Sequence, residues 1–352
     1  MRRLLALLLP LALVAAACGG DDDDGTAAPE TTSTTAAAAP EDAGELVIYS
    51  GRDEALVAPL IEQFEASSGY DVSVRYGSSA EMGAALLEEG ARSPAHVFLS
   101  QEVGAVGVLD KAGLLAELPT EVVERADERF RPADSTNWVG ITGRSRVIVY
   151  NTDLVTEVPE GVLDLTDERY RGQVAWVPGN ASFQAFITGF RVSHGEDAAR
   201  EWLEAMIANG AQEYSSNGDV LTAVDNGEIA IGLINHYYWA RLLAEVGEDG
   251  INSQLVFPTG GDPGGLVNAT AAGILRGGAE HPGALAFVEF LLSEEGQTYF
   301  VEETQEYPVV PGIGDPDGVP PLDELDGPAI DLTDLDSLEA SQALLTEVGL
   351  LS

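Results

Sequence analysis

The sequence predicts an α/β protein with doubly wound parallel sheets in two lobes, and two observations carry this prediction. First, short apolar runs typical of buried strands alternate with amphipathic, helix-like segments from Glu45 onward. Second, this alternation is interrupted by two closely spaced strands within residues 138–150 and starts again at Val174, as expected if a second lobe has its own sheet. The length of 352 residues suits two such units.

The first lobe is expected to contain three strands, 45–50, 72–76 and 96–99, with helices at 55–67 and 80–89 between them. In the first helix, the apolar residues Leu56, Leu60 and Phe64 keep to one face. The turns after the three strands, at 50–53, 77–79 and 100–102, should line one edge of a cleft, because open α/β sheets place ligands at the carboxyl ends of their strands.

The rest of the chain continues the pattern. We expect strands at 138–141 and 146–150 joined by a turn at 142–145, then strands at 174–177 and 229–234, helices from 182 to about 209, and a short helix from 217 to 224. Residues 262–268 look like a return crossing to the first lobe, followed by a strand at 271–275, paired helices at 282–303, and a last helix at 341–348.

The amino terminus has the composition of an export signal. Two arginines precede an apolar stretch, Leu4 to Ala17, that is too short to span a bilayer comfortably. Small residues lead into Cys18, the single cysteine, and this arrangement resembles a bacterial lipoprotein signal. We therefore expect a signal peptide at 1–17 and a disordered tether at 18–44, lipid-anchored through Cys18 to the outer face of the cytoplasmic membrane. The alternative is an ordinary signal peptide with a coincidental cysteine.

The formal charge of −42 is extreme, and Lys111 is the single lysine. Without a basic stripe to displace counterions from phosphates, nucleic acid is not expected as a partner. An acidic surface attracts cations, but a compositional bias or a salty habitat is the simpler account of this charge.

The most informative stretch is Tyr237-Tyr238, which follows a buried strand and opens a helix. Because the chain turns there, both phenols can face the same way, which they could not do in a strand. Asn235 is a good N-cap residue, so exposed N–H groups and a positive helix end should lie beside the phenols. This combination suggests a site for a hard trivalent cation and an anion, with simple packing at a helix start as the alternative.

An ordered set of motifs resembles the substrate-binding proteins of ABC-type ferric iron transporters, the bacterial transferrin-like family. The matching stretches cover residues 45 to about 312 and include Tyr49-Ser50-Gly51-Arg52, Gly143-Arg144-Ser145-Arg146, Ile234 to Trp239, and Glu306-Tyr307-Pro308. The resemblance implies a type II periplasmic-binding-protein fold with two crossing hinge strands. It places lobe 1 at 45–144 and 267–312, lobe 2 at 145–266, and an acidic tail with a helix at 313–352.

The resemblance also implies a site. Tyr237 and Tyr238 fall on the tyrosine pair that supplies two phenolate ligands to Fe³⁺ in this family, and phenolate oxygen is a hard donor that suits Fe³⁺. The family often adds a small anion such as phosphate or carbonate. The residues expected to hold that anion are Asn180, Ala181, Ser182, Asn217, Asn235, Arg52 and Arg144.

Two positions depart from the best-known branch of the family. Asp53 stands where that branch has a histidine ligand, and Gln101 stands where it has a glutamate, with Glu102 adjacent. Metal ligation by the first lobe is therefore expected from Asp53 and Gln101, with Glu102, a bidentate anion or water as alternatives. Phe183 occupies the place where other branches have a third tyrosine.

The expected function is capture of ferric iron and its delivery, by a monomer, to an ABC permease and its ATPase. The alternative keeps the fold and changes the ligand to a polyamine, thiamine or sugar phosphate. An enzyme is not expected, because the sequence has neither a Gly-x-Ser-x-Gly nor a His-Glu-x-x-His motif.

Overall fold

A computed structural model of the protein describes residues 44–351, all within one compact unit, Ala37–Ser352. The predicted signal peptide, Cys18 and almost all of the predicted tether lie outside the described residues. Within 44–351, no helix combines the length and the apolar composition needed to cross a bilayer.

Strands of the first half form a sheet in the order β2-β1-β3-β9-β4. Their bounds are β1 Glu45–Ser50, β2 Asp71–Tyr76, β3 Val97–Ser100, β4 Val139–Asn151 and β9 Val267–Ile274. The first three are parallel to one another, whereas β9 pairs antiparallel with both β3 and β4. The sheet is therefore mixed and not purely parallel, because β9 returns from the second half of the molecule.

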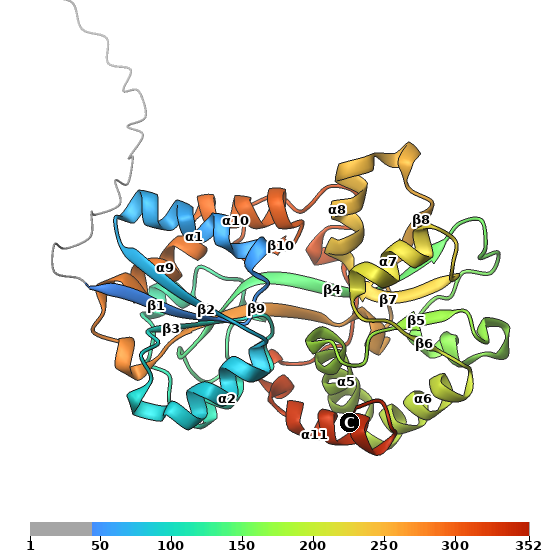
Figure 1. The fold of residues 1–352 in the computed structure, drawn as a ribbon, viewed down its shortest axis with the longest axis horizontal. Coiled ribbons are helices and arrows are strands. Elements are labelled where there is room, and N and C mark those ends of the chain that lie inside the picture. Colours follow the sequence, from blue (N-terminus) through green and yellow to red (C-terminus); the bar gives the residue numbers. More distant parts are fainter. Residues whose placement is uncertain (1–43, 352) are drawn as a thin grey trace, which may run out of the picture. The chain divides into compact units, whose positions relative to one another are not determined.

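The strand β4 corrects one prediction. Residues 142–145, expected to form a turn between two strands, lie inside this single strand of 13 residues. Glycine and polar residues favour a turn in the sequence, but here their backbone pairs with β9 and with the short strand β10, Tyr307–Pro308. Beyond Ser145 the same strand enters a second sheet, so that β4 and β9 are the two strands that cross between the halves (Figure 1).

The second sheet continues from β4 in the order β4-β7-β5-β6, with β8 also paired to β4. Its strands are β5 Val174–Trp176, β6 Gln212–Glu213, β7 Ile231–Asn235 and β8 Ser253–Val256. β5 lies parallel to β6 and β7, while β4 is antiparallel to β7 and β8. The predicted restart of the strand and helix alternation is thus confirmed, and the boundary predicted at 144/145 stays a prediction because β4 runs through it.

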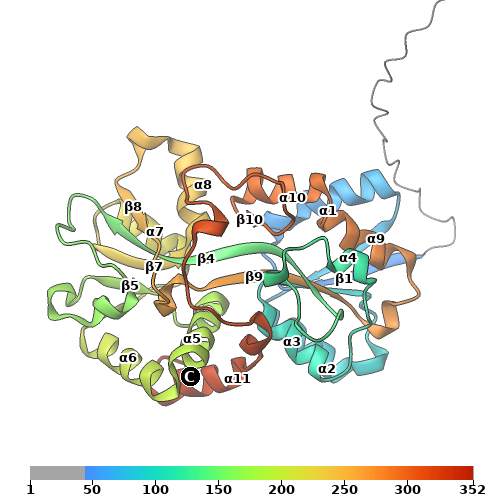
Figure 2. The same cartoon turned by 180° about the vertical axis from the view of Figure 1, so that it is seen from behind.

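Helices cover both faces of each sheet (Figures 1 and 2). Around the first sheet they are α1 Glu54–Ser68, α2 Ser79–Glu89, α3 Val103–Lys111, α4 Thr120–Val123, α9 Pro282–Leu291 and α10 Glu294–Tyr299. Around the second sheet they are α5 Ala181–His194, α6 Glu196–Ala208, α7 Asn217–Asp225, α8 His236–Val246 and α11 Leu338–Glu347. Side-chain caps fix several starts: Asp53 accepts from the Ala55 N–H at 2.9 Å, and Ser78 forms a capping box with Glu81.

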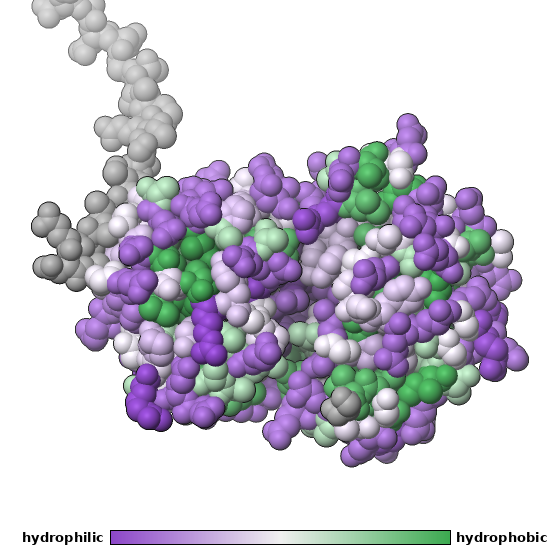
Figure 3. Space-filling view, viewed as in Figure 1, coloured by the Kyte–Doolittle hydropathy of each residue, from purple (hydrophilic) through white to green (hydrophobic). Residues whose placement is uncertain are grey.

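The apolar residues gather in a first core around the first sheet and in a second and a third core at the second sheet. The second core contains Ile148 of β4 and the third contains its neighbours Val147 and Val149, so these two cores lie on opposite faces of that sheet. Leu46, Val97 and Phe98 are buried in the first core, and Trp176 and Phe186 in the second. Hydrophilic residues cover most of the face in Figure 3, and the apolar residues on that face form separate patches. Apolar side chains in the interior and hydrophilic side chains on the surface are the arrangement expected from the hydrophobic effect.

The C-terminal segment contributes to the first and the second core. Leu335 packs into the first core, and Leu344 and Leu345, from α11, pack into the second. Before it reaches Leu335, the segment passes close to the residues that lead into β9. A Cβ added to Gly327 would lie 2.0 Å from the Gly265 carbonyl oxygen. Residues predicted as an acidic tail therefore pack against the folded body.

Candidate metal centre

Tyr237 and Tyr238 form a stacked pair at the first turn of α8. Their ring centroids are 4.4 Å apart with 27° between the ring planes, so the two phenols lie side by side as the sequence predicts. Tyr237 is only 1% exposed. Tyr238 is partly exposed and lines a cavity of about 350 Å³ between α7, α8 and residues 302–305.

The local sequence explains this placement. β7 is buried along its whole length and pairs on both sides, so its carboxyl end is fixed in the interior. Asn235 takes the extended N-cap conformation, as predicted, but its side chain makes no capping hydrogen bond. The first N–H groups of α8 and the positive end of its dipole therefore lie beside the two phenols.

The phenol of Tyr237 is held neutral in the absence of a cation. Burial raises its pKa above the ordinary value, and neighbouring Tyr238 raises it further, while Arg144 and Arg52 act in the opposite direction. A cation that binds here must displace the phenol proton. The nearby guanidinium groups make that displacement easier.

Arg52, Arg144 and Glu306 form a buried charge network near the tyrosines. Arg52 donates to the two Glu306 carboxylate oxygens at 2.9 and 2.8 Å and to Thr270 Oγ1 at 3.0 Å. Arg144 Nε lies 3.8 Å from Glu306 Oε1, and its Nη2 donates to the Gln101 carbonyl. Burial alone would raise the pKa of Glu306, but Arg52 and Arg144 hold it below its usual value.

Sequence reasoning did not give Glu306 or Arg146 a role. Arg146 is buried, donates to the Leu233 carbonyl at 3.1 Å, and lies over the ring of Phe183 at 5.4 Å. Burial lowers its pKa to about 9. Arg144 and Arg146 are two residues apart on β4, so their side chains face the same side of the strand. Their spacing could have indicated this, but residues 142–145 were expected to form a turn.

A small cavity of about 10 Å³ lies beside this network. Its lining consists of Arg144, Arg146, Ser182, Phe186, Asn235, Leu266 and Asn268. Three of the predicted anion-binding residues, Arg144, Ser182 and Asn235, are thus brought together, and Asn268 and Arg146 join them.

The other predicted anion residues have different surroundings. Asn180 caps α5: its Oδ1 accepts from the Ser182 N–H at 2.9 Å and from the Ser182 hydroxyl at 2.5 Å, with Ala181 between them at the helix start. Asn217 begins α7 and is buried with neither side-chain amide atom hydrogen-bonded. Arg52 is largely committed to Glu306.

The predicted first-lobe ligands lie at two helix starts. Asp53 is exposed and caps α1, while Gln101 precedes α3 and donates its N–H to Ser79 Oγ at 2.9 Å. Glu102 is buried and caps α3 through the Gly104 and Ala105 N–H groups. Across residues 44–351, no cluster of three or more histidine, cysteine, aspartate or glutamate side chains is placed to hold a metal ion.

His236, next to the tyrosines, is occupied on both ring nitrogens. Its Nδ1 accepts from the Ser145 N–H at 3.1 Å, and its Nε2 donates to the Gln305 carbonyl at 3.0 Å. Burial lowers its pKa to about 4, so the ring is neutral near pH 7. It therefore anchors α8 to the segment before β10.

Residues 92–326, more than half of the chain, match the family described as bacterial extracellular solute-binding protein. The chain belongs to this family. Its members bind solutes, in agreement with the expectation that the chain is not an enzyme, and its extracytoplasmic location follows from the same membership.

Several known proteins resemble this solute-binding protein along most of their length. The Fe(3+)-binding periplasmic protein of Serratia marcescens is 34% identical over 309 residues, covering 87% of this chain and 90% of the relative. The major ferric iron-binding protein of Neisseria meningitidis serogroup B is 30% identical, and the match covers 87% of this chain and 93% of the relative. Iron-bound HitA from Pseudomonas aeruginosa, known from a crystal structure, is 33% identical in sequence and has a TM-score of 0.81. The match covers 87% of this chain and 99% of HitA. The predicted type II binding-protein fold with two crossing strands is thereby confirmed.

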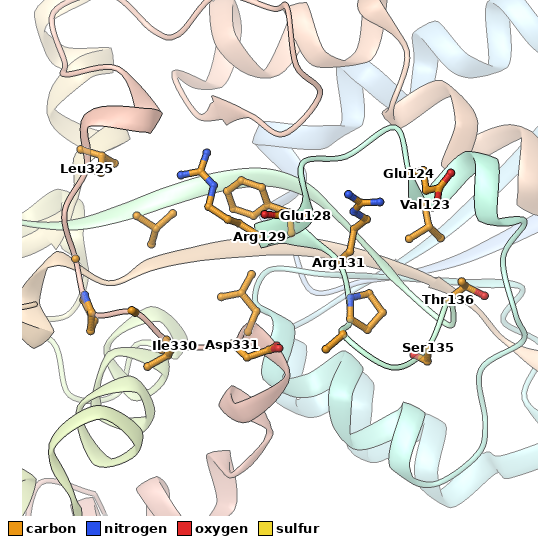
Figure 4. Close-up of a pocket in the computed structure, with 18 of the residues that line it drawn as sticks. Val123, Glu124, Glu128, Arg129, Arg131, Ser135, Thr136, Leu325, Ile330 and Asp331 are labelled. Carbon is orange, nitrogen blue, oxygen red and sulfur yellow. The ribbon is translucent and has the colours of Figure 1, made fainter.

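This solute-binding protein also has a larger cavity, of about 730 Å³, away from the predicted site. Residues 120–136, Val267 and the segment 325–332 line it. Figure 4 shows it near the crossing strands, with the side chains of Arg129, Arg131 and Glu124 around it. None of the predicted site residues lines this cavity.

Proposed function

We propose that this protein captures ferric iron outside the cytoplasmic membrane, with Tyr237 and Tyr238 as two phenolate ligands. The observation that carries the proposal is the stacked tyrosine pair at the first turn of α8, with one phenol buried and the other at a cavity. Phenolate is a hard ligand that suits a trivalent cation better than softer metals. The relatives named as ferric iron-binding proteins support the choice of metal.

A synergistic anion, phosphate or carbonate, completes the proposed site. The starts of α5, α7 and α8 supply Asn180, Ala181, Ser182, Asn217 and Asn235, and the adjacent guanidinium groups supply Arg52 and Arg144. Helix starts and guanidinium groups are the donors that proteins use for small oxyanions. A solved Trichodesmium relative, 26% identical with a TM-score of 0.73, is described in complex with iron and citrate.

Asp53 and Gln101 are the proposed ligands from the first half of the molecule. The Asp53 carboxylate is exposed and accepts a hydrogen bond from the Ala55 N–H at 2.9 Å. Both residues stand at helix starts in the predicted first lobe, whereas the tyrosine pair stands in the predicted second lobe. Iron bound by Asp53, Gln101 and the two tyrosines would therefore couple ligation to closure of the two lobes.

Delivery of iron completes the proposal. A monomer anchored through lipidated Cys18, with residues 18–44 as a tether, would pass its cargo to an ABC permease that is driven by its ATPase. The predicted lobes, 45–144 with 267–312 and 145–266, are the parts that would close on the iron.

A titration of the iron-free chain from Glu45 onward with ferric citrate tests the iron proposal. We expect one iron per chain and a visible phenolate-to-iron band, which Tyr238→Phe should abolish or strongly weaken. Tyr150→Phe is the matched control, because Tyr150 lies on β4 and its hydroxyl donates to Gln254 at 3.0 Å.

The outcomes separate the competing ligands. A band that survives unchanged in Tyr238→Phe would overturn the assignment of the ligands. Absence of any band, combined with a thermal shift from a polyamine, thiamine or a sugar phosphate, would replace iron by an organic solute.

A further inference from the structure

His236, the residue before the tyrosine pair, is completely buried and contacts an aromatic ring on each of two sides. Its imidazole stacks on Tyr307 of β10, with ring centroids 4.5 Å apart and 27° between the ring planes. Against Tyr237 it stands edge-on, with centroids 5.9 Å apart and 89° between the planes. Because Tyr237 stacks in turn on Tyr238, four rings form one continuous row from β10 to the start of α8. Interiors are close-packed, so a displaced imidazole would displace the tyrosine pair as well.

The hydrogen bonds of His236 fix its ring to two other parts of the chain. Nδ1 accepts from the Ser145 N–H on β4, so the proton of the neutral ring is on Nε2, which donates to the Gln305 carbonyl. With both nitrogens occupied, the imidazole has no lone pair left for a metal ion. At the proposed iron site, His236 is therefore suited to hold other groups and not to coordinate.

Gln305 presents its carbonyl from a strained backbone. Among residues 44–351 it alone of the non-glycine residues has a positive φ, with φ 58° and ψ 33°. This left-handed conformation is uncommon for a residue with a Cβ. It directly follows the π-helix Phe300–Thr304, a rare element that occurs frequently at functional sites. Backbone strain persists only where the surroundings enforce it, and it is concentrated at functional sites.

Contacts on both sides of Gln305 enforce this conformation. Its side chain donates to the Glu302 carbonyl at 2.9 Å, and the Glu306 N–H donates to the Phe300 carbonyl at 3.0 Å. The Glu306 carboxylate then pairs with Arg52 at 2.8 Å in the buried interior. The Gln305 carbonyl is thereby fixed beside the first sheet, whereas its imidazole partner begins a helix that covers the second sheet.

We propose that His236 is a positioning residue for iron ligation, which holds the tyrosine pair in place by fixing the first turn of α8 to β4 and to the Gln305 carbonyl. The inference rests on the proposed iron function, and it names a residue outside the proposed ligands and anion donors. Metal ligands have to be held within about 0.5 Å of their working positions by the groups around them. Without the imidazole, binding of iron would also have to order the two phenols, and affinity would fall.

Three substitutions of His236 separate its contacts. In His236→Asn the amide oxygen can replace Nδ1 and keep the hydrogen bond from Ser145, whereas in His236→Gln the amide nitrogen can replace Nε2 and keep the one to Gln305. His236→Phe keeps an aromatic ring and loses both hydrogen bonds. We expect iron affinity to fall about 10-fold in each of the first two variants and about 100-fold in His236→Phe. An affinity like the parent's in His236→Phe would overturn the proposal.

The visible spectrum distinguishes positioning from a general loss of stability. Lower stability alone reduces the melting temperature of the iron-free protein, but it leaves the phenolate-to-iron band of the folded, iron-loaded protein where the parent has it. Displaced phenolates change the wavelength or the intensity of that band, and we expect this change in all three variants. His194→Asn is the matched control, because His194 is exposed and its Nδ1 lies 2.8 Å from the neighbouring Ser193 Oγ. An unchanged band in every His236 variant would contradict the positioning role.

NMR of the iron-free protein supplies a measurement that does not depend on iron. With isotope-labelled tyrosine, and signals assigned from Tyr237→Phe and Tyr238→Phe, we expect the ring signals of both tyrosines to shift in His236→Asn and in His236→Gln. Signals identical to the parent's would sink the proposal. Shifted signals in a protein whose parent shows no iron band would refute the iron function and leave the placement of the tyrosines by His236 standing.

The parent protein alone provides a last check that no folding defect can disturb. Nitrogen NMR of the His236 ring, identified by its contact with Tyr307, should show a neutral imidazole with its proton on Nε2. A proton on Nδ1 would mean that the ring cannot accept from Ser145, and the proposal would fail.

Discussion

Glu306 is the carboxylate that two buried arginines share. It receives two hydrogen bonds from Arg52, lies 3.8 Å from Arg144, and is fully buried. Since its pKa is held below the usual value, its contribution to stability is present above the ordinary carboxyl pKa and is lost as the pH falls through the lowered value. The network therefore stabilises the fold near neutral pH.

Glu306→Gln should be strongly destabilising, because it leaves two guanidinium groups buried without a negative partner. We expect a loss of about 3–5 kcal/mol in the free energy of unfolding, measured by urea denaturation at neutral pH. Glu289→Gln is the control: its ion pair with Arg125 is about 40% exposed on each side and should contribute less than about 1 kcal/mol. Equal losses in the two variants would show that the buried network adds little.

At the scale of elements, local patterns predicted most strands and helices near the site. The apolar run before Tyr237 and the capping residue Asn235 placed the tyrosine pair at a strand-to-helix turn, because both signals lie within a few adjacent residues. The continuity of β4 was missed, since only pairing with β9 and β10 makes residues 142–145 extended. Glu306 was missed for a related reason: its partners Arg52 and Arg144 lie far away in the sequence.

At Gly140, the backbone of β4 lies close to Phe130. A Cβ there would lie 2.8 Å from both the Phe130 carbonyl oxygen and the Phe130 Cβ. We expect Gly140→Ala to destabilise the protein by about 1–3 kcal/mol, because the backbone of residues near 130 must move. Gly277→Ala, where no atom lies within 4 Å of the new Cβ, should be neutral or slightly stabilising in the same urea experiment. Similar losses at both positions would argue against the steric explanation.

At the scale of the whole molecule, the formal charge of −42 sets the response to salt. Like charges on a compact surface repel, and this repulsion destabilises the folded state. The buried arginines near the tyrosines give the interior a local charge opposite to that of the surface. Cations are thus attracted to the molecule in general, while anions are favoured only inside it.

Raising sodium gluconate should therefore raise the melting temperature, mostly below about 0.15 M, where the Debye length falls from about 30 to about 8 Å. Differential scanning calorimetry measures this shift. Potassium gluconate should act equally, since screening depends on ionic strength. A response to sodium alone would indicate specific cation binding, and a flat response would mean that surface repulsion is unimportant.

The C-terminal segment has a consequence for how the chain is made. The second core contains Ile148 and Trp176, and it also contains Leu344 and Leu345 from α11. During synthesis these leucines emerge after every other described strand and helix, so the second core stays incomplete until almost the whole chain has been made. The first core likewise waits for β9 and Leu335. Neither half can finish folding on a nascent chain, and the protein has to reach its native state after synthesis ends.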